Sequence, residues 1–200
     1  MAVSAPRRRM APDARRDHIL DAAARLILAE GVSAASMEQL GREAGVSKAL
    51  VYAYFPGPFE LLATLLEREQ RAFRATGRRL LEQAKDFESA VRLTTAAYLD
   101  HVATRGLLIE RLLNEPGIAG VMADAERADR RATTDFFGRA IARRYGMDPR
   151  RAALAADMLM GLTGAAGLRL RRMGEDRELL LELAIDLILA SLAGITPQPS

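Results

Sequence analysis

The chain has 200 residues, half of them hydrophobic, and its 29 lysines and arginines against 26 acidic residues give a formal net charge of +3. Alanine, leucine and arginine dominate while β-branched and aromatic residues are sparse, which favours an all-α fold of one large or two small domains. The sequence contains no cysteine and only two histidines, His18 and His101. We therefore expect no disulfide framework, no metal site and no cofactor.

The first residues predict a flexible basic arm over 1–12. Five arginines and one acid fall within residues 1–16, so this segment has a net charge of +4 and the rest of the chain about −1. No apolar run follows the arginines, so the segment does not read as a secretory signal. The arm could lie along DNA phosphates or enter a minor groove. A solvated tail is the alternative.

Residues 36–55 predict two short helices joined by a tight turn. Ser36 with Gln39 forms a capping box, so the first helix should begin at residue 37. Gly45 stands where a left-handed residue ends that helix, and Ser47 can cap the second. This is the helix-turn-helix layout, whose second helix enters the DNA major groove. The spacing by itself leaves an ordinary helical hairpin in a core equally open.

The remaining chain predicts further helices from its apolar periodicity and its glycine and proline breaks. With a first helix over 13–29 and the helix-turn-helix pair, they bring the count to about nine; the expected ranges are 59–81, 87–104, 106–114, 121–145, 149–172 and 176–193. The last helix is the most hydrophobic, but Glu182 and Asp186 interrupt it, so a helix buried between protein surfaces is expected rather than a membrane span. We expect the protein to be cytoplasmic.

The segment from Arg15 to Leu62 resembles the N-terminal domain of the tetracycline-repressor (TetR) family of bacterial transcriptional regulators. The elements occur in the family's order and spacing: residues 16–23 match its first helix, 30–32 the exit from that helix, 44–48 the turn, 51–56 the recognition helix and its end, and 60–62 the start of helix four.

The resemblance implies three DNA-binding helices over 13–57, a regulatory, ligand-binding and dimerisation domain over 58–195, and a tail over 196–200. It implies a homodimeric repressor that binds a palindromic double-stranded DNA operator and is released by a small-molecule inducer. The chain departs from the family at three positions. Leu50 replaces the usual threonine, Pro58 the usual lysine, and Gly41 the usual alanine, which weakens its helix by roughly 1 kcal/mol.

The resemblance and the helical spacing together assign the DNA-reading residues. Lys48 is expected to contact a guanine edge or a phosphate, and the alanines a thymine methyl group. The two tyrosine hydroxyls are expected at phosphates, although Tyr52 could instead be a core aromatic. The predicted DNA-binding residues are Ser36, Ser47, Lys48, Ala49, Leu50, Tyr52, Ala53 and Tyr54.

A ligand cavity and a dimer surface are expected in the second domain. The predicted pocket residues are Phe73, Tyr98, His101, Arg111, Asn114, Phe136, Met158 and Leu162. The apolar members could equally be plain core, and the polar ones could lie on the surface. One small-sided helix and the apolar last helix predict a four-helix dimer interface, with a monomer of generous core as the alternative. Its predicted residues are Ala152, Ala156, Gly164, Leu179, Leu183 and Leu187.

Two other classes of function are compatible with parts of the sequence. The sequence has no Ser-His-Asp order, glycine-rich phosphate loop or paired-carboxylate motif, so we expect no enzymatic activity. A helical interaction protein without DNA binding would fit the departures at Leu50 and Pro58. An activator, or a regulator without a small-molecule inducer, would share the fold.

Overall fold

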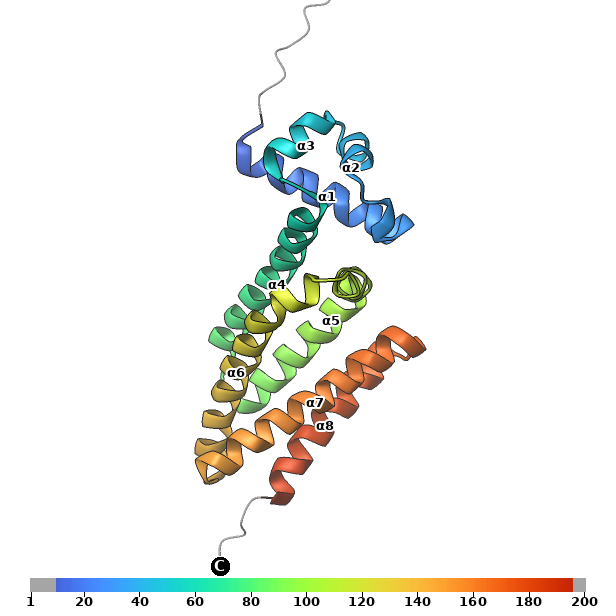
Figure 1. Cartoon of the computed structure of the whole chain (residues 1–200). Helices are drawn as coiled ribbons and strands as arrows, with labels where there is room; N and C mark the ends of the chain where they lie inside the picture. Colours follow the sequence, from blue (N-terminus) through green and yellow to red (C-terminus); the bar gives the residue numbers. More distant parts are fainter. Residues whose placement is uncertain (1–9, 196–200) are drawn as a thin grey trace, which may run out of the picture.

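The computed structural model describes residues 10–195, which form eight α-helices and one 3₁₀-helix and contain no β-strand (Figure 1). The all-α prediction is confirmed. Residues 1–9 of the predicted arm and the predicted tail over 196–200 lie outside the described residues. The helices are α1 Pro12–Glu30, η1 Val32–Ala34, α2 Met37–Glu43, α3 Lys48–Tyr54, α4 Pro58–Gln83, α5 Phe87–Leu113, α6 Ile118–Tyr145, α7 Pro149–Met173 and α8 Arg177–Ile195.

One helix boundary in the body was predicted wrongly. Residues 87–104 and 106–114 were expected as two helices, but they form the single helix α5. A glycine inside a helix costs only about 1 kcal/mol, and apolar burial on both sides of Gly106 outweighs that cost. Leu99 before it and Leu108 and Leu112 after it are fully buried. The ninth helical element is instead the short η1, in a segment that the sequence left without structure.

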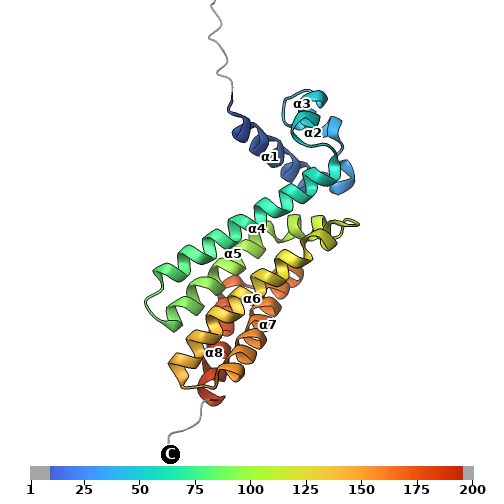
Figure 2. The ribbon, with the colours of Figure 1, turned by 60° about the vertical axis from the view of Figure 1, so that its left-hand side comes forward.

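The helices form a head and a body joined by α4 (Figures 1 and 2). The head is α1, η1, α2 and α3, and the body is α4 to α8. Figure 2 shows α4 leaving the head and running along α5 and α6, with α7 and α8 beyond them. Helix α3 lies at the end of the molecule away from the body.

Three apolar clusters hold this arrangement together. The first fills the head and continues into the adjoining ends of α4 and α5, because Leu65 and Leu108 pack against the head residues. The second and third lie in the body: one surrounds Ile141 and Ile188, and the other Leu99 and Ile185. The head is therefore not a separate unit joined to the body by a flexible linker. It shares its core with the body.

Candidate nucleic-acid interface

Two side-chain caps build the helix-turn-helix. The Gln39 amide donates to Ser36 Oγ at 3.3 Å, and the Leu50 amide donates to Ser47 Oγ at 3.2 Å. Gly45 has a φ of +64°, which glycine adopts without strain. The predicted start of α2 at residue 37, the Ser47 cap and the left-handed Gly45 are confirmed. The capping box is incomplete, because the Ser36 amide already donates to the Ala34 carbonyl at 2.8 Å; Ser36 Oγ donates instead to Gln39 Oε1 at 3.0 Å.

The glycine at position 41 has a packing role that the sequence did not reveal. A Cβ there would lie 2.9 Å from the Val46 carbonyl oxygen and 3.3 Å from the Lys48 amide nitrogen. The turn therefore passes closer to α2 than an alanine permits without movement. The expected helix-propensity loss is real in isolation, but here the missing side chain makes room for the turn, whose Val46 amide donates to the Gly41 carbonyl at 2.8 Å.

The first helix braces this motif through contacts that sequence reasoning missed. His18 Nε2 donates to the Ala44 carbonyl at the end of α2 at 2.8 Å, and Arg25 pairs with Glu43 at 2.9 Å. The Arg16 guanidinium lies 5.3 Å from the centre of the Phe55 ring. Spacing could have identified His18, because it precedes the buried Ala22 by one helical turn and so shares the inward face of α1.

Helix α3 presents a mostly exposed outer face. Lys48, Ala49 and Ala53 are exposed, and Tyr52 is 47% exposed, so Tyr52 is not a core aromatic. Their positions, one turn apart, put them on a single surface. Val51 and Phe55 are buried, whereas Leu50 is half-buried and Tyr54 packs against the head core. The DNA contacts themselves stay a prediction.

The start of α4 is unfavourable to phosphate. Amide groups in the first turn of a helix can bind a phosphate. However, the Glu60 side chain folds back over this turn, so that its Oε2 would lie 2.9 Å from a Cβ at Gly57. A carboxylate at a helix N-terminus satisfies the helix dipole and repels another anion.

Three predicted pocket residues come together between α4 and α5. The rings of Phe73 and His101 stack with centroids 4.4 Å apart, and Tyr98 lies 6.2 Å from Phe73. Tyr98 also lies against α7, where a Cβ at Gly167 would approach its ring to 2.7 Å. Burial lowers the pKa of His101, although the charge of Glu69 opposes this effect, and burial raises the pKa of Tyr98.

The other predicted pocket residues lie elsewhere, and three assignments are wrong. Arg111 is occupied at the end of α1, where it donates to the Ile27 carbonyl and, at 2.9 Å, to the Leu28 carbonyl. Asn114 is exposed at the C-terminus of α5, and Met158 is 75% exposed on α7.

The last two lie in the lower body: Phe136 packs against Phe137 with centroids 5.3 Å apart, and Leu162 contacts both body clusters. Two open grooves, of about 370 and 400 Å³, lie instead along α6 with α7 and along α4 with α6. None of the predicted pocket residues lines either groove.

The predicted dimer residues divide into two groups. Ala152 and Ala156 are buried in the chain's own core, so this part of the prediction is wrong: they face α6 and α8 rather than solvent. Leu179, Leu183 and Leu187 are 59%, 51% and 44% exposed, and a Cβ at Gly164 would meet open space. The surface also includes residues that the sequence analysis missed, with α7 spacings of three and four: Leu154, Met158, Gly161, Ala165 and Leu168.

We name this surface the α7–α8 face: Leu154, Met158, Gly161, Gly164, Ala165 and Leu168 of α7, with Leu179, Leu183 and Leu187 of α8.

By length and composition α7 is the one unbroken helix in the described chain that could cross a membrane, which is weak evidence by itself. No three metal-ligating side chains come together among the described residues.

Comparison with known proteins finds relatives of the head and of most of the chain. Residues 19–65 match the family model for bacterial regulatory proteins of the tetR family. The chain is 28% identical over 160 residues to the transcriptional activator FasR of Mycolicibacterium smegmatis, covering 78% of this chain and 71% of FasR. It is 30% identical over 131 residues to the transcriptional regulator AcrR of Shigella flexneri, covering 62% of this chain and 60% of AcrR.

Solved structures share the whole fold. The fatty acid degradation regulator FadR from Bacillus halodurans superposes with a TM-score of 0.74 at 18% identity, over 96% of this chain and 100% of that one. A TetR-like regulator from Rhodococcus sp. RHA1 gives 0.73 at 19% identity, over 93% and 100%. Residues 19–65 thus match the tetR family of bacterial regulatory proteins, the described residues share the fold of TetR-like regulators, and these curated relatives are transcriptional regulators rather than enzymes.

Proposed function

We propose that this regulator is a cytoplasmic homodimeric repressor that binds a palindromic operator and leaves it when a small molecule binds the body. The observation that carries the proposal is the presence of two exposed surfaces of different chemistry on one chain. The outer face of α3 is small-sided and polar, as a DNA-reading helix requires, and the α7–α8 face is apolar, as a subunit interface requires.

Reading of the operator rests on four side chains. Lys48 at the first turn of α3 is suited to a guanine edge or a phosphate, and the methyl groups of Ala49 and Ala53 are suited to thymine methyls. The Tyr52 hydroxyl, on a half-exposed ring, is suited to a phosphate. One such helix covers only a few base pairs, so two copies and a two-fold site are needed for specificity.

Dimerisation supplies the second copy. The α7–α8 face offers large apolar side chains beside Gly161 and Gly164, which let another backbone approach closely. Exposed leucines and a methionine on two adjacent helices are costly in water and are covered when α7 and α8 of two subunits form a four-helix interface. The pairing of these helices also accounts for the membrane-like composition of α7.

The inducer is proposed to act at the ring cluster of Phe73, Tyr98 and His101. These rings fill the space between α4, α5 and α7, so a ligand binds by separating them. Helix α4 carries Phe73 and leads directly into the head. A ligand that favours a separated arrangement thereby favours a different position of the head.

The test is binding to a labelled fragment of the protein's own upstream intergenic DNA at two salt concentrations. The wild type is compared with Lys48→Ala and with Lys85→Ala, an exposed lysine distant from α3. Salt-sensitive binding tighter than to random DNA, weakened about tenfold or more by Lys48→Ala alone, supports the proposal. Binding of random DNA only would favour the helical interaction protein.

Activation is the second candidate, because the 160-residue similarity is to a protein named as an activator. Transcription in vitro from the bound promoter separates the two. A transcript that falls with added protein supports repression, and one that rises supports activation.

A further inference from the structure

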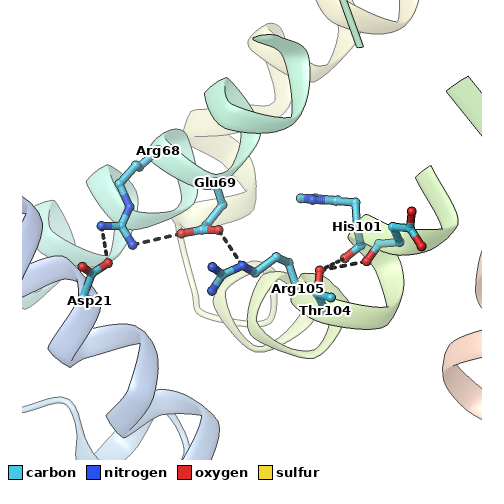
Figure 3. Close-up of polar contacts among 7 residues, drawn as sticks. Asp21, Arg68, Glu69, His101, Thr104 and Arg105 are labelled. Carbon is cyan, nitrogen blue, oxygen red and sulfur yellow. Dashed lines mark hydrogen bonds and ion pairs between the residues drawn. The ribbon is translucent and has the colours of Figure 1, made fainter. Parts of the chain in front are cut away.

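A chain of four alternating charges joins the head to the body where α1, α4 and α5 meet (Figure 3). Arg68 of α4 donates to Asp21 of α1 at 2.8 Å and to its own neighbour Glu69 at 3.0 Å. Arg105 of α5 lies 3.5 Å from the second oxygen of Glu69. We call Asp21, Arg68, Glu69 and Arg105 the charge chain. It holds α4 against α1 on one side and against α5 on the other.

Glu69 is the member that fixes the geometry. Its residue is only 7% exposed, whereas the Asp21 side chain is 58% exposed and can exchange its partner for water. A buried carboxylate is stable only while it stays paired and hydrogen-bonded. Arrangements in which Glu69 loses either arginine are therefore disfavoured, and the three helices share one preferred relative position.

A second set of hydrogen bonds connects the body to α1. Arg111 of α5 donates to the carbonyls of Ile27 and Leu28 at the C-terminal end of α1. Ile27 is six residues from Asp21, which is about 9 Å along a helix. Apolar packing between α1 and α5 is non-directional and permits sliding. Two directional ties at separate points on α1 determine its angle as well as its position.

We propose that Glu69 is a positioning residue for DNA binding: through the charge chain it fixes the angle of the head on the body, and thereby sets which half-site spacing the dimer accepts. This inference rests on the proposed two-fold operator binding. Two recognition helices must reach half-sites at a defined separation, so a change in the angle of each head moves both helices out of register. A residue that only stabilised the fold would leave the accepted spacing unchanged.

The experiment selects bound sequences from a library of random duplex DNA, using the full chain as wild type and as Glu69→Gln. The glutamine keeps the size of the side chain and removes its charge. We expect the wild type to enrich one half-site spacing and Glu69→Gln to enrich the same half-site at several spacings. Affinity for the wild type's preferred full site should fall about tenfold, the scale of a typical coupling between sites, while single half-site binding stays the same.

Glu67→Gln is the matched control, because Glu67 pairs with Arg71 within α4 at 2.5 Å and on an exposed surface, and bridges no helices. It should keep the single spacing. Asp21→Asn cuts the charge chain at its exposed end and should broaden the spacing without leaving a buried charge unpaired, so it decides the matter if Glu69→Gln does not fold.

Two outcomes would overturn the inference, and they are distinguishable. One unchanged spacing with Asp21→Asn and with folded Glu69→Gln would overturn it and leave the proposed function intact. Enrichment of no two-fold site by the wild type would overturn both. Thermal unfolding of every variant separates loss of fold from change of spacing.

Discussion

The outer face of α3 and the α7–α8 face are both exposed, yet their chemistry is opposite. The first displays Lys48, Ala49, Tyr52 and Ala53, whose small and polar side chains are compatible with water in the absence of a partner. The second displays leucines that are about half exposed and a methionine that is 75% exposed. A small-sided, polar surface can be exposed to water without a partner at little cost in free energy, whereas an apolar surface of this kind is stable only when it is covered.

The two surfaces also differ in what builds them. Local chemistry shapes the first: two serine caps and one left-handed glycine within twelve residues determine α2, the turn and α3. The α7–α8 face results instead from how these two helices are oriented on the body. The side of each helix that faces the body is buried, and the opposite side is exposed. A substitution on one surface should therefore leave the other intact.

Leu183→Glu should have the largest effect, because it makes the apolar α7–α8 face polar and leaves the outer face of α3 unchanged. It places an unpaired carboxylate on each side of the proposed interface, so we expect the dimer dissociation constant to rise by at least about 100-fold. Full-operator binding should be lost while binding to a half-site is retained. Light scattering and fluorescence anisotropy measure the two effects. Gln83→Glu, which adds the same charge at an exposed site at the end of α4, should leave the dimer intact.

His18→Ala tests the contact between α1 and the helix-turn-helix that supports the outer face of α3. It removes the hydrogen bond to the Ala44 carbonyl, so we expect the free energy of unfolding to fall by about 1 kcal/mol and DNA affinity to fall with it. Chemical denaturation measures the first, and anisotropy the second. His18→Gln retains an N–H donor and should restore much of both. Equal stability of wild type and alanine variant would show that the contact contributes nothing.

Glu60→Gln should strengthen DNA binding at the start of α4. Removing the carboxylate that folds over the start of α4 relieves repulsion of a nearby phosphate, so we expect about threefold tighter binding, largest at low salt. The measurement is anisotropy over a salt series. Glu67→Gln, about two helical turns further along the same helix, serves as the control. Unchanged or weaker binding by Glu60→Gln would place the DNA backbone away from this turn.

The smallest effect concerns the pH dependence of the body. Burial holds the pKa of His101 below its ordinary value of 6.5, so the unfolded chain takes up this proton more readily than the folded one. Its contribution to stability is complete above pH 6.5 and is lost as the pH falls through 6.5 toward the folded-state pKa.

Thermal unfolding at pH 7.5 and pH 5.5 should therefore show a lower Tm at the lower pH. His101→Phe keeps the ring against Phe73 but cannot titrate, so it should lower the Tm less between the two pH values. A wild type and a variant with the same dependence would assign the effect to other groups.

The DNA-binding motif was predictable because its signals are local. Ser36, Ser47 and Gly45 each act within three or four residues of chain, so their effect on the backbone does not depend on what packs around them. The burial of Val51 and Phe55 likewise agrees with their spacing of one helical turn. The brace by His18 was missed because it spans 26 residues of sequence.

The body sites were less predictable because they depend on helix orientation. A small residue looks the same in a sequence whether it faces a partner or the core, so Ala152 and Ala156 were placed on the wrong side of α7. Arg111 was assigned to a ligand although its guanidinium ends at α1, 83 and 84 residues away in the chain.

The sequence by itself determined the all-α class, the helix-turn-helix and the apolar character of the last helices, because composition, capping and periodicity act over one or two helical turns. Only the tertiary structure decided which face of α7 is exposed, where Arg111 binds and that Glu69 is shared between two arginines. These depend on the angles at which whole helices pack, and those angles arise from contacts between residues far apart in the chain.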